Sequence, residues 1–118
     1  VLGCTLWTDF QLFGKCEASK SVARLSMNDF RIIQNGSKAF SPEDSVDLFN
    51  TELGWLKDKL NNPFNGKTIV VTHHAPSNQS TPPLYDENYA AIATSVCITT
   101  GLKGICSNSI SLTTSFQR

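Results

Sequence analysis

The clearest pattern in the chain is an amphipathic helix followed by an apolar strand. Apolar residues recur at spacings of three and four from residue 42 to about residue 60, which places them on one side of a helix: Val46, Phe49, Leu53, Leu56 and Leu60. Ser41 is suited to cap this helix, Pro42 to occupy its first position and Pro63 to stop its continuation. The β-branched run at residues 67–72 predicts a strand, so the two elements form an α/β crossover unit.

The first third of the chain carries weaker patterns. Residues 1–7 alternate in a way that predicts a strand buried on both sides. Residues 16–28 are polar with scattered apolar positions, which favours a weak helix or an irregular lid. Residues 30–34 are apolar enough for a strand or a loop, and the Asn35-Gly36 pair after them predicts a turn.

The last third of the chain changes in character. Three prolines in residues 75–84 predict a surface loop, and Asp86 can cap a following helix. Residues 98–118 hold eight Ser or Thr and no carboxylate, with alternation at 109–113 that allows a short strand. We therefore expect a domain at residues 1–97 and a diverged or out-of-frame tail at residues 98–118.

Composition limits the classes of partner. The 118 residues suffice for one domain, and ten basic against ten acidic residues give a net charge of zero. This balance argues against nucleic acid or an anionic membrane as a partner, and no apolar run approaches the roughly 20 residues that span a bilayer. Without a recognisable secretory signal, we expect a cytoplasmic protein whose four cysteines are reduced: Cys4, Cys16, Cys97 and Cys106.

The candidate chemistry lies at the end of the predicted strand, where His73 and His74 are the only histidines of the chain. Imidazole is a common ligand of divalent metals, and a ligand placed where a strand ends opens into the crevice beyond the sheet. Successive residues of an extended chain point in opposite directions, so one histidine is expected to bind metal while the other supports it or binds an anion. The alternative is a structural pair that is hydrogen-bonded to nearby loops.

The sequence THHAPS at residues 72–77 resembles the calcineurin-like metallophosphoesterase superfamily. The segment VLGCTLWTDF at residues 1–10 looks like the strand and loop that follow the Gly-Asn-His motif in one bacterial branch of that family. Residues 27–30 and the pair Trp55-Leu56 are also similar to that branch. The resemblance covers about residues 1–96.

The resemblance implies an α/β fold that is part of a four-layer αββα sandwich. It implies a divalent metal pair (Mn, Fe or Zn) about 4 Å apart that activates water against a phosphoester small-molecule substrate. By the match to the His-His-x-Pro motif, His73 would be a metal ligand. His74 would be the catalytic residue beside the phosphate.

The chain lacks the family's other ligand motifs, namely Asp-x-His, the bridging Asp, Gly-Asn-His and the terminal Gly-His-x-His. Asp9, Asp29 and Asp86 read as turn and cap residues. We therefore expect a metal-dependent phosphoester hydrolase by resemblance that is incomplete and inactive as it stands. The alternative is a non-enzymatic α/β binding or regulatory module, and an uncovered sheet would favour self-association.

Overall fold

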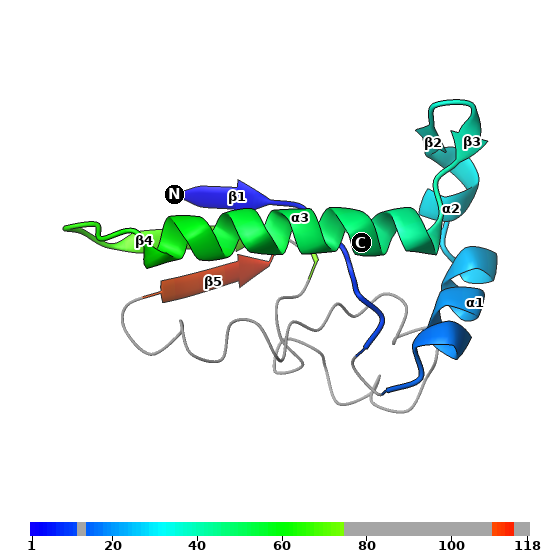
Figure 1. Ribbon diagram of the computed structural model, residues 1–118, viewed down its shortest axis with the longest axis horizontal. Coiled ribbons are helices and arrows are strands. Elements are labelled where there is room, and N and C mark those ends of the chain that lie inside the picture. The colour runs from blue at the N-terminus through cyan, green and yellow to red at the C-terminus, as the bar shows by residue number, and fades with distance from the viewer. Residues whose placement is uncertain (12–13, 75–109, 115–118) are drawn as a thin grey trace.

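The protein is built around a three-stranded parallel sheet that packs against one long helix (Figure 1). The computed structural model describes residues 1–11, residues 14–74 and the strand at residues 110–114. The strands are β1 (Leu2–Cys4), β4 (Thr68–Thr72) and β5 (Ile110–Thr114), in the order β1-β4-β5. The register places Val70, in the middle of β4, opposite Leu2 and Leu112. The chain is therefore of the α/β class, with β4 central in this sheet.

Helix α3 (Pro42–Asn61) confirms the strongest sequence prediction. The backbone amide of Asp44 donates to Ser41 Oγ over 3.1 Å, and the amide of Ser41 donates back to Asp44 Oδ2 over 2.8 Å. This capping box satisfies two amides at the start of the helix, where no intrahelical partner exists. The helix ends at Asn61, because Pro63 disfavours a helical backbone at the residue before it.

The contact between α3 and the sheet forms the first of two core clusters. Its buried members are Leu6, Phe49, Leu56 and Val70. Along β4, Val70 and Thr72 are buried, whereas Ile69 and Val71 are 42% and 37% exposed. Because side chains alternate along a strand, α3 covers one face of β4, and the two exposed residues belong to the other face.

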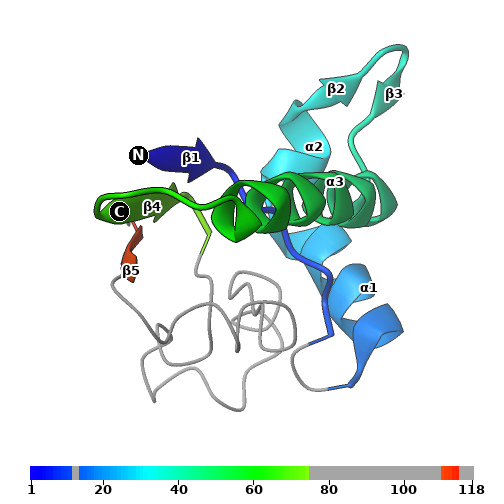
Figure 2. The ribbon, with the colours of Figure 1, turned by 60° about the vertical axis from the view of Figure 1, so that its left-hand side comes forward.

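The second cluster lies near the N-terminal end of α3, among the helices α1 (Cys16–Ser26) and α2 (Asp29–Ile32). Its buried members are Phe10, Ala23, Met27, Phe30 and Phe40. Figure 2 shows α1, α2 and the hairpin of β2 (Gln34–Asn35) and β3 (Lys38–Ala39) at this end, away from the sheet. Trp7 packs against both clusters and so links the two parts of the core.

Four further sequence predictions are now decided. Of the weak helix and the irregular lid that residues 16–28 allowed, the structure forms the helix, α1. The short strand allowed at residues 109–113 is confirmed as β5, and Gly36 takes a positive φ of 64° in the hairpin turn. The prediction of a strand or loop at residues 30–34 was wrong for its first half, which forms α2. A helical turn there lets Phe30 stack against Phe40, with ring centroids 5.7 Å apart.

The first strand is shorter and less buried than the sequence predicted. It covers only Leu2–Cys4, and its middle residue, Gly3, is exposed. The chain then leaves the sheet through two residues of positive φ, Leu6 at 53° and Phe10 at 58°, whose side chains are fully buried. Left-handed backbone costs a non-glycine residue roughly 1–2 kcal/mol, and burial of each side chain offsets a cost of that size.

The predicted loop at residues 75–84 and the helix expected after Asp86 lie outside the residues that the structure describes.

Candidate metal-ligating histidines at the end of strand β4

His73 and His74 lie directly beyond the carboxyl end of β4, as the sequence predicted. Two hydrogen bonds hold this turn. The backbone amide of His74 donates to the carbonyl of Thr5 over 3.1 Å, and Thr72 Oγ1 donates to the carbonyl of His74 over 2.8 Å. The pair is therefore anchored to the end of β1 as well as to β4, at the edge where open α/β sheets place ligands.

The two imidazoles occupy different surroundings. His73 is exposed, whereas His74 is partly buried, and its ring centroid lies 5.2 Å from that of Trp7. The two histidine rings meet edge to face, with centroids 5.0 Å apart. The imidazole of His73 is thus accessible to a ligand from solvent, whereas that of His74 packs beside Trp7.

The buried position changes the proton affinity of His74. Burial, together with the neighbouring His73, lowers the pKa of His74 to about 4, and the carboxylate of Asp29 opposes this shift. His74 is consequently neutral near pH 7. A neutral imidazole can donate through one nitrogen and accept through the other, or bind a metal.

In the described structure the carboxylates do not join the histidines in a metal site, although Asp29 influences the pKa of His74. Asp9 Oδ1 accepts from the backbone amide of Gln11 over 3.0 Å, which confirms its turn role, and burial raises the pKa of Asp9. Asp29 occupies the first turn of α2, and Asp86 lies outside the described residues. Within residues 1–11 and 14–74, no group of three or more His, Cys, Asp or Glu side chains could hold a metal ion.

Cys4 and Cys16 are free thiols, and Cys4 pairs with Thr72 in the register of β1 and β4. Burial and the charge of Glu52 raise the pKa of Cys4, which disfavours the reactive thiolate. The thiol of Cys16 donates to the carbonyl of Asp9 over 3.7 Å.

The sequence offered no reason to place Trp7 beside the histidines, although it lies within the segment at residues 1–10 that resembles the phosphoesterase family. Its backbone amide donates to Glu52 Oε2 on α3 over 3.3 Å, and its ring contacts both His74 and Phe40. Trp7 is therefore the residue that joins the histidine turn to the rest of the core. Only the long-range contacts of the loop after β1 reveal this role.

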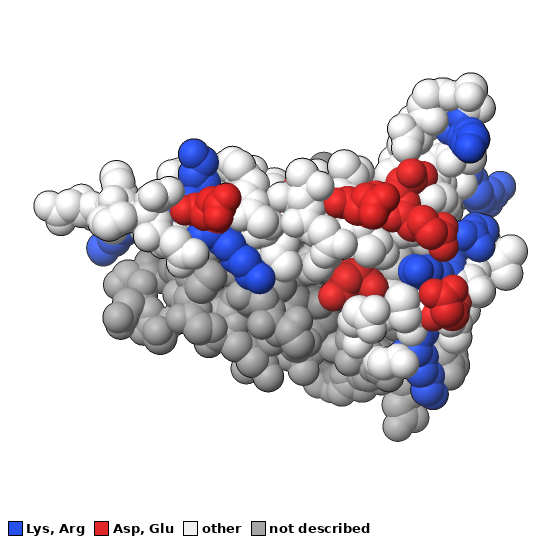
Figure 3. Space-filling model, viewed as in Figure 1, with Lys and Arg blue, Asp and Glu red and all other residues white. Residues whose placement is uncertain are grey.

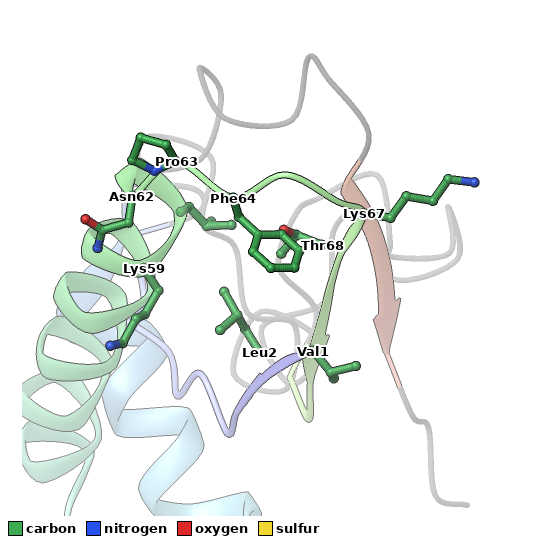
Figure 4. Close-up of a pocket in the computed structure, with 9 residues that line it drawn as sticks. Val1, Leu2, Lys59, Asn62, Pro63, Phe64, Lys67 and Thr68 are labelled. Atoms are coloured by element: carbon green, nitrogen blue, oxygen red, sulfur yellow. The ribbon is translucent and has the colours of Figure 1, made fainter.

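A cavity of about 300 Å³ lies at the opposite end of β4, between the end of α3 and the first residues of β1 and β4 (Figure 4). It is lined mainly by apolar groups, including Leu2, Leu60 and Phe64. Figure 4 shows the side chain of Lys67 directed away from it. Because β4 runs from this cavity towards the histidines, the cavity has no part in their chemistry.

Comparison with known proteins identifies no relative. No protein-family model matches the sequence, and neither a characterised protein nor a solved structure does so. None of the helices in the described structure is both long and apolar enough to cross a membrane.

Proposed function

We propose that this chain supplies the His-His portion of a metal-dependent phosphoester hydrolase centre of the calcineurin-like kind. In this proposal His73 is a metal ligand, and His74 lies beside the phosphate of a small-molecule phosphoester. The observation that carries the proposal is the position of an exposed histidine at the carboxyl end of the central parallel strand, next to a second, partly buried imidazole. The resemblance of residues 72–77 to the family motif supports the same assignment.

The described side chains supply one ligand for a metal ion, not the full set of ligands that a metal pair needs. His73 is accessible and offers a nitrogen donor suited to Mn, Fe or Zn. The described residues bring no second and third ligand to it. A bound metal pair would supply an activated water and charge stabilisation. We infer that the remaining ligands would have to come from outside the residues that the structure describes. Because the family's other ligand motifs are missing from the sequence, we further infer that this chain alone does not hydrolyse phosphoesters.

The four-layer αββα sandwich belongs to the same proposal. Helix α3 covers one face of β4, while Ile69 and Val71 on the other face remain 42% and 37% exposed. A second sheet packed on that face would bury both residues and complete two inner layers. The exposed apolar residues support this arrangement.

Metal titration followed by a turnover assay tests the proposal. Co²⁺ added to the chain is expected to bind weakly with one imidazole in its coordination shell, which the visible spectrum of the ion reports. The His73→Gln variant should lose this binding, whereas His74→Gln, the matched control, should retain it. Equal binding by wild type and His73→Gln would refute the ligand assignment.

The turnover assay uses bis-(p-nitrophenyl) phosphate with added Mn²⁺. We expect no hydrolysis above that of the buffer. Hydrolysis abolished by His73→Gln would show that the chain is a working hydrolase and overturn the proposed incompleteness.

A non-enzymatic α/β binding or regulatory module on the same scaffold is the second candidate. The burial of His74 against Trp7 favours it, because such a ring contributes packing without chemistry. Tight binding of a single metal ion without turnover would support this alternative over the first.

A further inference from the structure

A second cavity, of about 400 Å³, lies between the first half of α3, the hairpin β2–β3 and Trp7. It is distinct from the histidine turn, although Trp7 contacts both. The residues that line it are Trp7, Ile33, Gln34, Asn35, Phe40, Asp44, Asp47 and Leu48. This set combines an apolar part with two carboxylates, and no basic residue belongs to it.

Aromatic rings form one part of the lining. Trp7 and Phe40 pack with ring centroids 4.8 Å apart and an interplanar angle of 53°, so the cavity meets two tilted ring systems. Ile33 and Leu48 extend this apolar part and are 38% and 42% exposed. Phe40 is only 5% exposed, so the partly exposed Trp7 supplies most of the aromatic surface, and Ile33 and Leu48 supply the apolar surface beside it.

The two carboxylates lie one helical turn apart on α3, where residues three apart share a face. Acidic side chains gather over this half of the helix (Figure 3). Asp44 Oδ1 accepts from Asn35 Nδ2 over 3.0 Å, and Asp44 Oδ2 accepts from the amide and the hydroxyl of Ser41, each over 2.8 Å. These bonds, with a smaller contribution from Lys38, lower the pKa of Asp44 and so favour its charged form. The same bonds hold the carboxylate in one position.

The two carboxylates and the apolar lining beside them decide which kind of cation fits. Both of its oxygens already accept from protein donors, so Asp44 offers negative charge more readily than further hydrogen bonds. Asp47 is exposed and adds a second negative charge whose carboxylate has no protein partner in the described structure. A quaternary ammonium ion carries its positive charge inside an apolar shell of methyl groups, so it matches the two carboxylates and the aromatic and apolar surface together.

We propose that the cavity beside Trp7 binds a quaternary ammonium group, with its methyl groups against Trp7 and Phe40 and its charge near Asp44 and Asp47. The site is independent of metal and of the histidines, so the proposed hydrolase function can fail without affecting it. The charge of the ligand is recognised by Coulomb attraction and by the aromatic rings together.

Tryptophan fluorescence tests the proposal in the metal-free protein. The chain has two tryptophans, so a Trp55→Phe background leaves Trp7 as the only one and makes it the reporter. Choline chloride is titrated at constant ionic strength and compared with 3,3-dimethylbutan-1-ol, its neutral isostere. We expect a saturable change with choline and a dissociation constant at least about tenfold weaker for the isostere. Equal responses, or no saturable response to choline, would overturn the proposal.

Two variants separate the site from general surface charge. Asp47→Asn removes a lining carboxylate and is expected to weaken choline binding about fivefold, the size of an exposed cation interaction. Asp58→Asn removes the same charge from an exposed position on α3 outside the cavity and should leave binding unchanged. Equal effects of the two variants would show non-specific attraction.

Methylammonium is the third probe. Tighter binding of this hydrogen-bonding cation than of choline would contradict the quaternary assignment.

Discussion

The backbone amide of His74 donates to the carbonyl of Thr5 over 3.1 Å and so joins the end of β4 to the end of β1. The two residues are far apart in sequence, and this bond extends the parallel pairing of the strands by one step beyond Cys4 and Thr72. It places His74 against Trp7, which comes two residues after Thr5. The position of the histidine pair is therefore set by both strands.

The partly buried imidazole of His74 makes stability depend on pH. Its pKa is about 4 in the folded protein, against about 6.5 when unfolded, so the unfolded state binds more protons between these values. The contribution is fully present above about pH 6.5 and is lost as the pH falls towards 4. Urea unfolding measures the free energy of unfolding at pH 7 and at pH 5. Between these two pH values the wild type should lose about 2 kcal/mol more of this free energy than His74→Gln loses. Equal losses in both proteins would contradict the burial of a neutral ring.

Removal of the Thr72 hydroxyl should loosen the histidine turn. Thr72→Val keeps the shape of this buried residue but removes the bond of 2.8 Å to the carbonyl of His74. We expect a loss of about 1–2 kcal/mol in the free energy of unfolding, since the carbonyl loses its partner. Thr51→Val removes an exposed hydroxyl that donates to the backbone carbonyl of Asp47, and it should lower the free energy of unfolding by less than about 0.5 kcal/mol. Similar losses for the two variants would mean that the hydroxyl of Thr72 does not hold the turn.

The contact between α3 and the sheet should dominate stability. Leu56 is fully buried in the first cluster, so Leu56→Ala leaves a cavity and is expected to cost about 2–5 kcal/mol. Leu25 is 81% exposed on α1, and Leu25→Ala should change the unfolding free energy by less than about 0.5 kcal/mol. Chemical denaturation of both variants measures the difference. A small effect at Leu56 would show that α3 does not pack on β4 as described.

The exposed face of β4 should promote self-association. Ile69 and Val71 present apolar surface beside one another on this face. Size exclusion across a range of protein concentrations is expected to show oligomers or loss of soluble protein. The double variant Ile69→Lys and Val71→Lys should shift the protein towards monomer, because charge opposes association through this face. A wild-type protein that elutes as a sharp monomer and melts cooperatively would refute the prediction.

Local chemistry was enough to predict α3, β4 and the turn at Asn35-Gly36. A helix cap, a stripe of apolar residues and a β-branched run each act over a few neighbouring residues, so they can be read without knowledge of the rest of the fold. The exposure of one histidine and the burial of the next followed in part from strand alternation. The resemblance to phosphoesterases stays a prediction.

The tertiary structure alone decided how the segments meet. Residues 29–32 form a helix because Phe30 gains a partner in Phe40, although their own pattern allowed a strand or a loop. Trp7 lies beside His74 because the chain leaves β1 through the left-handed Leu6 and is held by Glu52 on α3. The sequence by itself determined where the long helix, its strand and the two histidines lie along the chain. Their surroundings depend on contacts between residues that are distant in sequence, whose energies no local pattern contains.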